Sequence, residues 1–196
     1  MPNVILKEPD LSFFRVLFVY LYMLQLIFAL ILCFLLQKPY FEYKPDDKRF
    51  SILVWNLPEE RVVTIPTDLG RLDFHTLETE IPIDSSRSAK GAISYCDYPE
   101  GTIHSDSIDF HDDFFDATVQ QSASRLNGLL VYQDDYSLGK YPGRIWRIHY
   151  YDSAAVMKSR AFLVGSRLYI IQVACSKEFA IHPSIDLFLN SFRSME

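Results

Sequence analysis

Apolar positions first gather in one unbroken run near the N-terminus. Residues 16–36 include no charged side chain, and Gln25 is their only strongly polar residue. As a helix rising about 1.5 Å per residue, the run would be roughly 30 Å long, the thickness of a bilayer core. It exceeds the apolar part of a cleaved signal peptide, and no small-residue cleavage site follows it. We therefore expect a flank at 1–15 and a retained transmembrane helix at 16–36, with a buried helix of a soluble protein as the alternative.

The charges around this run leave its orientation open. Two basic residues precede it, and four follow it at Lys38, Lys44, Lys48 and Arg49. Counting by the positive-inside rule favours a cytoplasmic C-terminal side, whereas a short N-terminus before a first span commonly stays in the cytoplasm. We expect a single-pass protein of the cell membrane whose C-terminal domain is extracytoplasmic, with the cytoplasmic side as the alternative.

The pattern changes beyond the apolar run. Residues 37–49 combine two prolines with many charges and are typical of a stalk. From residue 50, apolar and polar positions alternate with period two, as in strands. Strands are predicted at 51–56, 61–67, 71–81, 91–98, 129–137, 144–151, 160–164 and 167–175. Helical spacing predicts a helix over 106–126, closed by Asn127-Gly128, and a second helix from Pro183 onward.

This order of elements predicts an α+β domain at 50–196, an antiparallel β-sheet covered by helices. The run 167–175 is apolar on both faces except for Gln172, which is typical of a central strand. With 49% hydrophobic residues the chain can bury a core, and its net charge of −6 argues against a nucleic-acid partner. Three cysteines are too few for a disulfide framework, although Cys96 and Cys175 could pair if their strands are neighbours.

Four segments carry a family resemblance. They are Leu57-Pro58, Tyr141-Pro142-Gly143-Arg144, the hairpin from Arg160 to Tyr169 and Phe188-Leu-Asn-Ser-Phe192. The chain resembles the Mog1/PsbP-like family, in particular uncharacterised bacterial members. The resemblance implies an α/β/α sandwich and a non-enzymatic role in binding or assembling a partner protein. It supplies no binding residues, because no motif specific to one branch of the family is present.

Basic residues in the C-terminal half form the first candidate site. Residues 37–116 carry 8 Lys/Arg against 17 Asp/Glu, whereas residues 117–196 carry 9 against 6. Arginine suits bidentate contact with carboxylates, so a partner surface would use Arg144, Arg147, Arg160 and Arg167. On a strand, Arg144 would share a face with Trp146, and Arg147 would lie on the opposite face with His149. Internal ion pairs and solvated strand edges are the alternative interpretation.

A stretch of histidines and aspartates forms the second candidate site. Two imidazoles and two carboxylates could bind a divalent metal through His104, Asp106, Asp109 and His111. The alternative is an acidic first helical turn that complements the helix dipole. We expect no resident cofactor.

Motifs of catalysis are absent from the sequence. It has no G-x-S-x-G, no P-loop, no G-x-G-x-x-G and no C-x-x-C. The turn at Tyr141-Pro142-Gly143 is interpreted as structural, with glycine where a side chain would be forbidden. The sequence therefore predicts a non-catalytic, membrane-anchored protein that binds a partner complex at the membrane surface. A ligand- or metal-binding module that uses residues 104–116 is the alternative.

Overall fold

The computed structural model describes residues 18–28, 39–107 and 111–196. The chain divides into two units, Met1–Pro39 and Tyr40–Glu196. In the first unit, residues 18–28 are helical with exposed apolar side chains. Residues 16, 17 and 29–36 of the expected membrane helix lie outside the described residues. Within the described ranges, no helix has both the length and the apolar character needed to cross a membrane.

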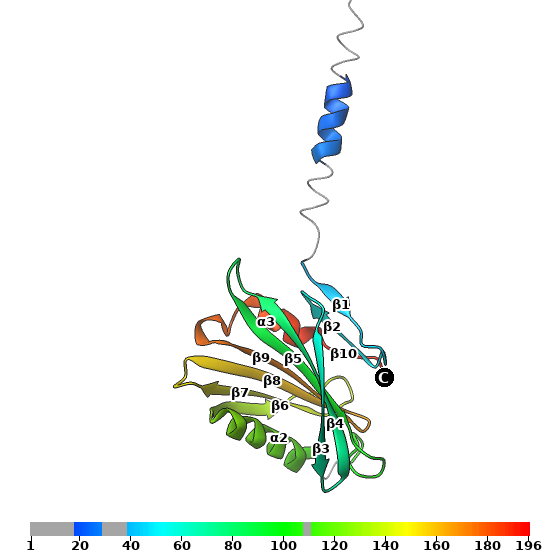
Figure 1. Ribbon diagram of the computed structural model, residues 1–196, viewed down its shortest axis with the longest axis vertical. Helices are drawn as coiled ribbons and strands as arrows, with labels where there is room; N and C mark the ends of the chain where they lie inside the picture. The colour runs from blue at the N-terminus through cyan, green and yellow to red at the C-terminus, as the bar shows by residue number, and fades with distance from the viewer. Residues whose placement is uncertain (1–17, 29–38, 108–110) are drawn as a thin grey trace, which may run out of the picture. The chain divides into compact units, whose positions relative to one another are not determined.

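Seven antiparallel strands form the main sheet of residues 40–196, in the order β3-β4-β5-β9-β8-β7-β6 (Figure 1). They are β3 (Glu59–Thr67), β4 (Gly70–Pro82), β5 (Ser88–Asp97), β6 (Leu129–Asp135), β7 (Gly143–Tyr150), β8 (Ala155–Val164) and β9 (Arg167–Ser176). All eight strands expected from periodicity are present, one of them as β2 (Phe50–Val54) outside this sheet. The α+β class and the antiparallel pairing are therefore confirmed.

A second, three-stranded sheet joins the two ends of the domain. It has the order β1-β2-β10, with β1 at Phe41–Tyr43 and β10 at Arg193–Ser194. The predicted stalk at 37–49 thus contributes its later residues to the compact unit, which begins at Tyr40 rather than at residue 50. Pairing with β2 explains this difference, because so short a strand carries no periodic signal of its own.

Helices lie on both faces of the main sheet. Helix α3 (Pro183–Ser191) and strand β2 pack on one face around Phe50, Phe188 and Tyr169. Helix α2 (His111–Leu126) packs on the other face, mainly against β7 and β6, around Phe115, Val119 and Trp146. Strand β9 is the fourth of the seven strands and is buried along most of its length, and its Gln172 donates to Ser159 Oγ at 3.0 Å. The central position predicted for this strand is confirmed.

Element ends differ from the sequence predictions at two places. Helix α2 begins at His111 rather than residue 106, with residues 108–110 not described. Strand β8 begins at Ala155, since its first residues pair with both β7 and the end of β9. The expected close of α2 is confirmed: Asn127 has φ of 46°, and the Gly128 amide donates to Ala123 O at 3.0 Å.

The pairing of Cys96 with Cys175, left open by the sequence, does not occur. Both thiols are free and buried. Their strands β5 and β9 are neighbours, but Cys96 lies opposite Leu168 and Cys175 lies opposite Val156. Leu168 and Cys175 are seven positions apart, which is about 23 Å along a strand and well beyond disulfide reach.

Gly143 is required by a close approach of the backbone. A Cβ at this position would lie 2.3 Å from Ala161 O and 2.5 Å from Tyr136 O. Both are main-chain atoms that cannot move without disturbing the sheet. The sequence-based interpretation of a glycine at a forbidden position is confirmed.

We expect Gly143→Ala to lower the free energy of unfolding by about 3 kcal/mol or more, because β7 must separate from β8. Gly139→Ala is the matched control, since that glycine has φ of 61° but nothing within 4 Å of an added Cβ. The control should cost only about 1 kcal/mol of backbone strain. Urea unfolding of both variants measures the difference, and equal losses would contradict the steric explanation.

Candidate functional site

The four arginines of the predicted partner surface lie in different environments. Arg144 is on the α2 side of β7, whereas Arg147 is on the opposite side, as the alternation predicted. The side chains of Arg144 and Arg167 are only 10% and 7% exposed. Arg147 and Arg160 are partly exposed. The four residues therefore do not form one continuous surface.

Arg144 is surrounded by carboxylates of α2 and β6. Its Nη2 donates to Asp112 Oδ1 at 3.0 Å and lies 3.6 Å from Asp116 Oδ1. Its Nη1 lies 3.1 Å from Asp135 Oδ1. These contacts join the start of α2 to the end of β6. Arg144 is committed to this internal cluster, so a partner could reach its guanidinium only through the three aspartates.

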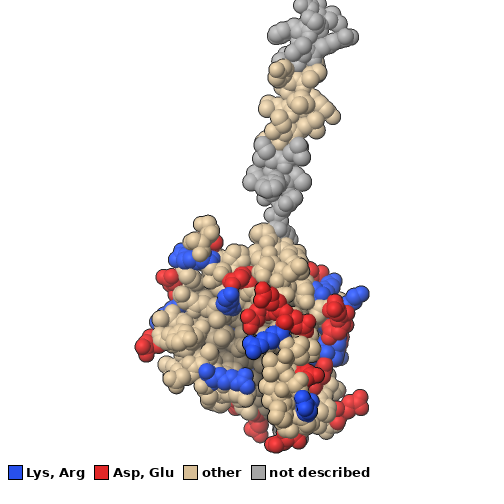
Figure 2. Space-filling view, viewed as in Figure 1, with Lys and Arg blue, Asp and Glu red and all other residues tan. Residues whose placement is uncertain are grey.

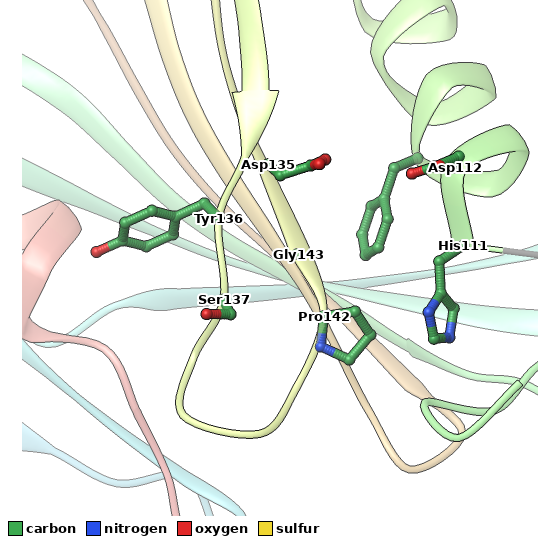
Figure 3. Close-up of a pocket in the computed structure, with 8 residues that line it drawn as sticks. His111, Asp112, Asp135, Tyr136, Ser137, Pro142 and Gly143 are labelled. Carbon is green, nitrogen blue, oxygen red and sulfur yellow. The ribbon is translucent and has the colours of Figure 1, made fainter. Parts of the chain in front are cut away.

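A pocket of about 370 Å³ opens beside this cluster. Its lining residues come from the start of α2 and the β6–β7 turn: His111, Asp112, Phe115, Asp135, Tyr136, Ser137, Pro142 and Gly143. Figure 3 shows Asp112 and Asp135 pointing toward each other, whereas the ring of Tyr136 points away. Because both carboxylates already contact Arg144, the pocket is acidic but internally compensated.

The predicted metal ligands do not converge where the structure describes them. Nε2 of His111 lies 3.3 Å from the main-chain oxygen of His104, not from its ring. Nδ1 of His104 lies 3.6 Å from Asp106 Oδ2, and Asp109 lies outside the described residues. Among the described residues, no three His, Cys, Asp or Glu side chains come together in a way that could hold a metal ion.

Arg167 forms the second internal cluster, at the start of β9. Its Nε donates to Asp97 Oδ1 at 2.7 Å, and its Nη1 donates to Asp47 Oδ2. Its guanidinium carbon lies 4.7 Å from the centre of the Tyr95 ring, within cation–π range. Arg49 extends the cluster through Asp97 Oδ1 at 3.1 Å and through Glu196. Arg167 therefore holds together both ends of the domain.

Arg160 links β8 to α3. Its Nη1 donates to Asn190 Oδ1 at 2.7 Å and to Leu189 O at 3.3 Å. Its guanidinium carbon lies 4.9 Å from the centre of the Tyr136 ring. These contacts are neutral, so Arg160 keeps its full positive charge while its position is fixed.

Arg147 differs from the other three arginines. In the described part of the chain its side chain forms neither an ion pair nor a hydrogen bond, whereas Arg144 and Arg167 form ion pairs and Arg160 forms hydrogen bonds to neutral groups. It lies between Tyr132 of β6 and Lys158 of β8 in the sheet register. Arg147 is thus the predicted site residue that remains available for a ligand.

The charge split along the sequence does not separate into acidic and basic areas on the face that Figure 2 shows. Figure 2 shows acidic and basic side chains interspersed over the visible face of residues 40–196. The antiparallel sheet and α2 bring the two halves together, as in the Arg144–Asp112, Arg167–Asp97 and Arg87–Glu178 pairs. Folding therefore pairs charges of one half of the sequence with charges of the other.

Sequence reasoning missed the acidic partners of the buried arginines. Asp47 and Arg167 are 120 residues apart, and no local pattern connects them. A detectable signal did exist for Arg144, since aspartates at the start of a helix can face a neighbouring strand. The exposed apolar residues of β6 were also missed, because they read as part of an ordinary strand.

Comparisons with known proteins leave the family open. No family model and no curated protein match the chain. Among solved structures, it is similar to the crystal structure of a protein of unknown function from Pseudomonas aeruginosa. The TM-score is 0.40 at 10% identity, covering 71% of this chain and 84% of that chain. The Mog1/PsbP-like resemblance stays a prediction.

The Arg167 cluster generates a pH prediction. Hydrogen bonds from Arg167 lower the pKa of Asp97 below its ordinary value, against the effect of burial. A carboxylate with a lowered pKa stabilises the fold above the unfolded pKa of about 4, and this contribution is lost as the pH falls through the folded pKa. We therefore expect Asp97→Asn to be less stable than the parent at pH 7 and to lose less stability on acidification.

Urea unfolding between about pH 2.5 and 7 tests this expectation. Asp68→Asn, at the exposed β3–β4 turn, is the control and should follow the parent curve. Parallel curves for the parent and Asp97→Asn would show that the Asp97 carboxylate is not coupled to folding.

Proposed function

We propose that this protein is a non-catalytic, membrane-anchored module that binds a partner protein through the α3-side face of β6 and β7. We call this face the β6–β7 outer face and define it by Leu129, Tyr132, Ile145, Arg147 and His149. The observation that carries the proposal is Arg147, a half-buried cation without an ionic partner among the described residues. Arginine and aromatic residues are enriched in protein interfaces.

The packing of α3 supports this assignment. It contacts mainly β2, β4 and β9, which leaves the β6 end of the same face less covered. Ile145, Arg147 and His149 are accordingly only partly buried. The fold therefore supplies a sheet face that is rigid and partly open.

The edge strand β6 adds apolar surface. Its Leu129, Val131 and Tyr132 are 67%, 46% and 43% exposed, respectively. Among the strands that the structure describes, β6 pairs with β7 alone, which leaves its other edge unpaired and suited to pairing with another chain. Apolar side chains next to an unpaired cation suit a partner protein better than a small polar ligand.

The membrane anchor belongs to the proposal and rests on the apolar run 16–36. Residues 18–28 are helical and expose their apolar side chains, which supports a lipid environment for this segment. An anchor would confine the search for a partner to the membrane surface. The partner is expected on the extracytoplasmic side of the membrane, with the cytoplasmic side as the alternative.

Photo-crosslinking tests the partner surface. With the photoreactive p-benzoylphenylalanine in place of Tyr132, the full chain in its native membranes should give one discrete adduct. The same residue in place of Val63, 42% exposed on the opposite edge strand β3, is the control and should give none. Adducts at both positions, or at neither, would count against a partner surface at β6.

Membrane fractionation tests the anchor. We expect the double variant Leu24→Arg/Phe28→Arg to leave the membrane fraction, since each arginine near a helix centre costs about 2.5–3.5 kcal/mol of insertion free energy. Val63→Arg is the control and should remain membrane-bound. If the double variant stays in the membrane fraction after alkaline extraction, residues 16–36 are not the anchor. The partner surface is then judged by the crosslinking experiment alone.

A further inference from the structure

Two buried polar atoms on the β6–β7 outer face lack hydrogen-bond partners among the described residues. They are Nε of Arg147 and Nε2 of His149. Because these residues are two positions apart on β7, their side chains share one face of the sheet. Buried polar groups are nearly always paired, and an unpaired one costs free energy. Two such atoms on a partly open face therefore indicate that a ligand supplies their hydrogen-bond partners.

The surroundings of these atoms are basic. Lys158 lies opposite Arg147 in the register of β7 and β8. Burial lowers the pKa of His149, and the positive charges of Arg147 and Lys177 lower it further. Lys177 follows β9 directly, and its amide donates to Ala154 O at 2.9 Å, just before β8 begins. Because Val156 of β8 lies opposite His149, Lys177 is placed beside the His149 end of this face.

The carboxylates near this face do not neutralise it. Asp186 of α3 pairs with Lys158 at 2.6 Å, so the charge of Lys158 is already compensated. Glu178 pairs with Arg87 at 3.6 Å. Asp134 lies opposite Ile145, one row along the sheet from Arg147. Among the described residues near this face, Arg147, Arg160 and Lys177 have no carboxylate partner, and Arg160 is held instead by Asn190 Oδ1 and Leu189 O.

We propose that Arg147, assisted by Lys177, binds a carboxylate of an acidic segment of the partner protein. This inference rests on the proposed function and adds the chemistry of the recognised group. The guanidinium can offer two parallel N–H donors to two carboxylate oxygens, which would satisfy the orphaned Nε. Lys177 contributes a second positive charge from the end of β9.

The same face argues against an anionic membrane as the ligand. Lipid surfaces are bound by clusters of about four to eight basic residues, whereas the cations without a carboxylate partner on and beside this face are Arg147, Arg160 and Lys177. Asp134 and the exposed Leu129 and Tyr132 adjoin them. A polypeptide with an acidic and an apolar residue complements both the cations and the exposed apolar side chains of this face. A uniformly anionic lipid surface complements the cations alone.

Fluorescence anisotropy of the full chain in neutral detergent tests this proposal. The probe is a labelled, end-blocked hexaglutamate peptide at about 50 mM salt, where charge pairing is least screened. We expect saturable binding that Arg147→Met weakens about tenfold, that Arg147→Lys weakens less, and that Lys177→Met weakens a few fold. Arg193→Met, in β10 of the three-stranded sheet, is the control and should change binding less than twofold.

A stability readout separates this role from a structural one. Arg147→Met removes a buried donor without a partner, so the thermal unfolding temperature should not fall. Arg160→Met should lower it, because Arg160 holds α3 through Asn190 and Leu189. A clear loss of stability in Arg147→Met would assign Arg147 to the fold rather than to a ligand.

Three results would overturn the proposal. They are no hexaglutamate binding at millimolar peptide, equal losses in Arg147→Met and Arg193→Met, and Arg147-dependent binding to phosphatidylglycerol vesicles without peptide binding. The last result would assign the site to the membrane surface. If hexaglutamate does not bind but the crosslinked adduct at position 132 still forms, the partner surface is retained, and only the proposal that it recognises a carboxylate is rejected.

Discussion

The burial of β9 on both faces of the main sheet is the constraint on which the rest of the domain depends. Tyr169, Ile171 and Val173 enter the core beneath α3 and β2, and Leu168 enters the core beneath α2. Arg167 begins the strand and is held by Asp97 and Asp47. Because β9 is fixed at its first residue and along both sides, it sets the register of β5 and β8 and, through β8, the position of β7.

This arrangement divides the polar residues into two groups with different roles. Arg144, Arg160 and Arg167 stabilise the domain by joining elements that are distant in the sequence. Arg147 lies on the same sheet but makes no comparable contact among the described residues, although keeping it there buries an unpaired donor. Residues that lower the stability of the fold and make no stabilising contact are expected at functional sites. Arg147 on the β6–β7 outer face is such a residue.

Much of the fold was predictable because periodicity reports burial directly. The alternation around Arg144 and Arg147, the apolar run from Arg167 and the close of α2 at Asn127 were all readable in the sequence. Strands β1 and β10 were not, since three and two residues carry no period and form only by pairing with β2. The site was less predictable, because whether an arginine is paired depends on aspartates brought in by distant elements.

On the proposed function, β6 offers an unpaired edge and a partly open face to a partner at the membrane. Hydrogen exchange of the full chain, purified and in its native membranes, distinguishes a free β6 from one that a partner covers. We expect the amides of β6 to exchange fast in the purified protein and slowly in the membranes, whereas β3 exchanges fast and β9 slowly in both. Equal exchange of β6 under the two conditions would show that no partner covers this strand.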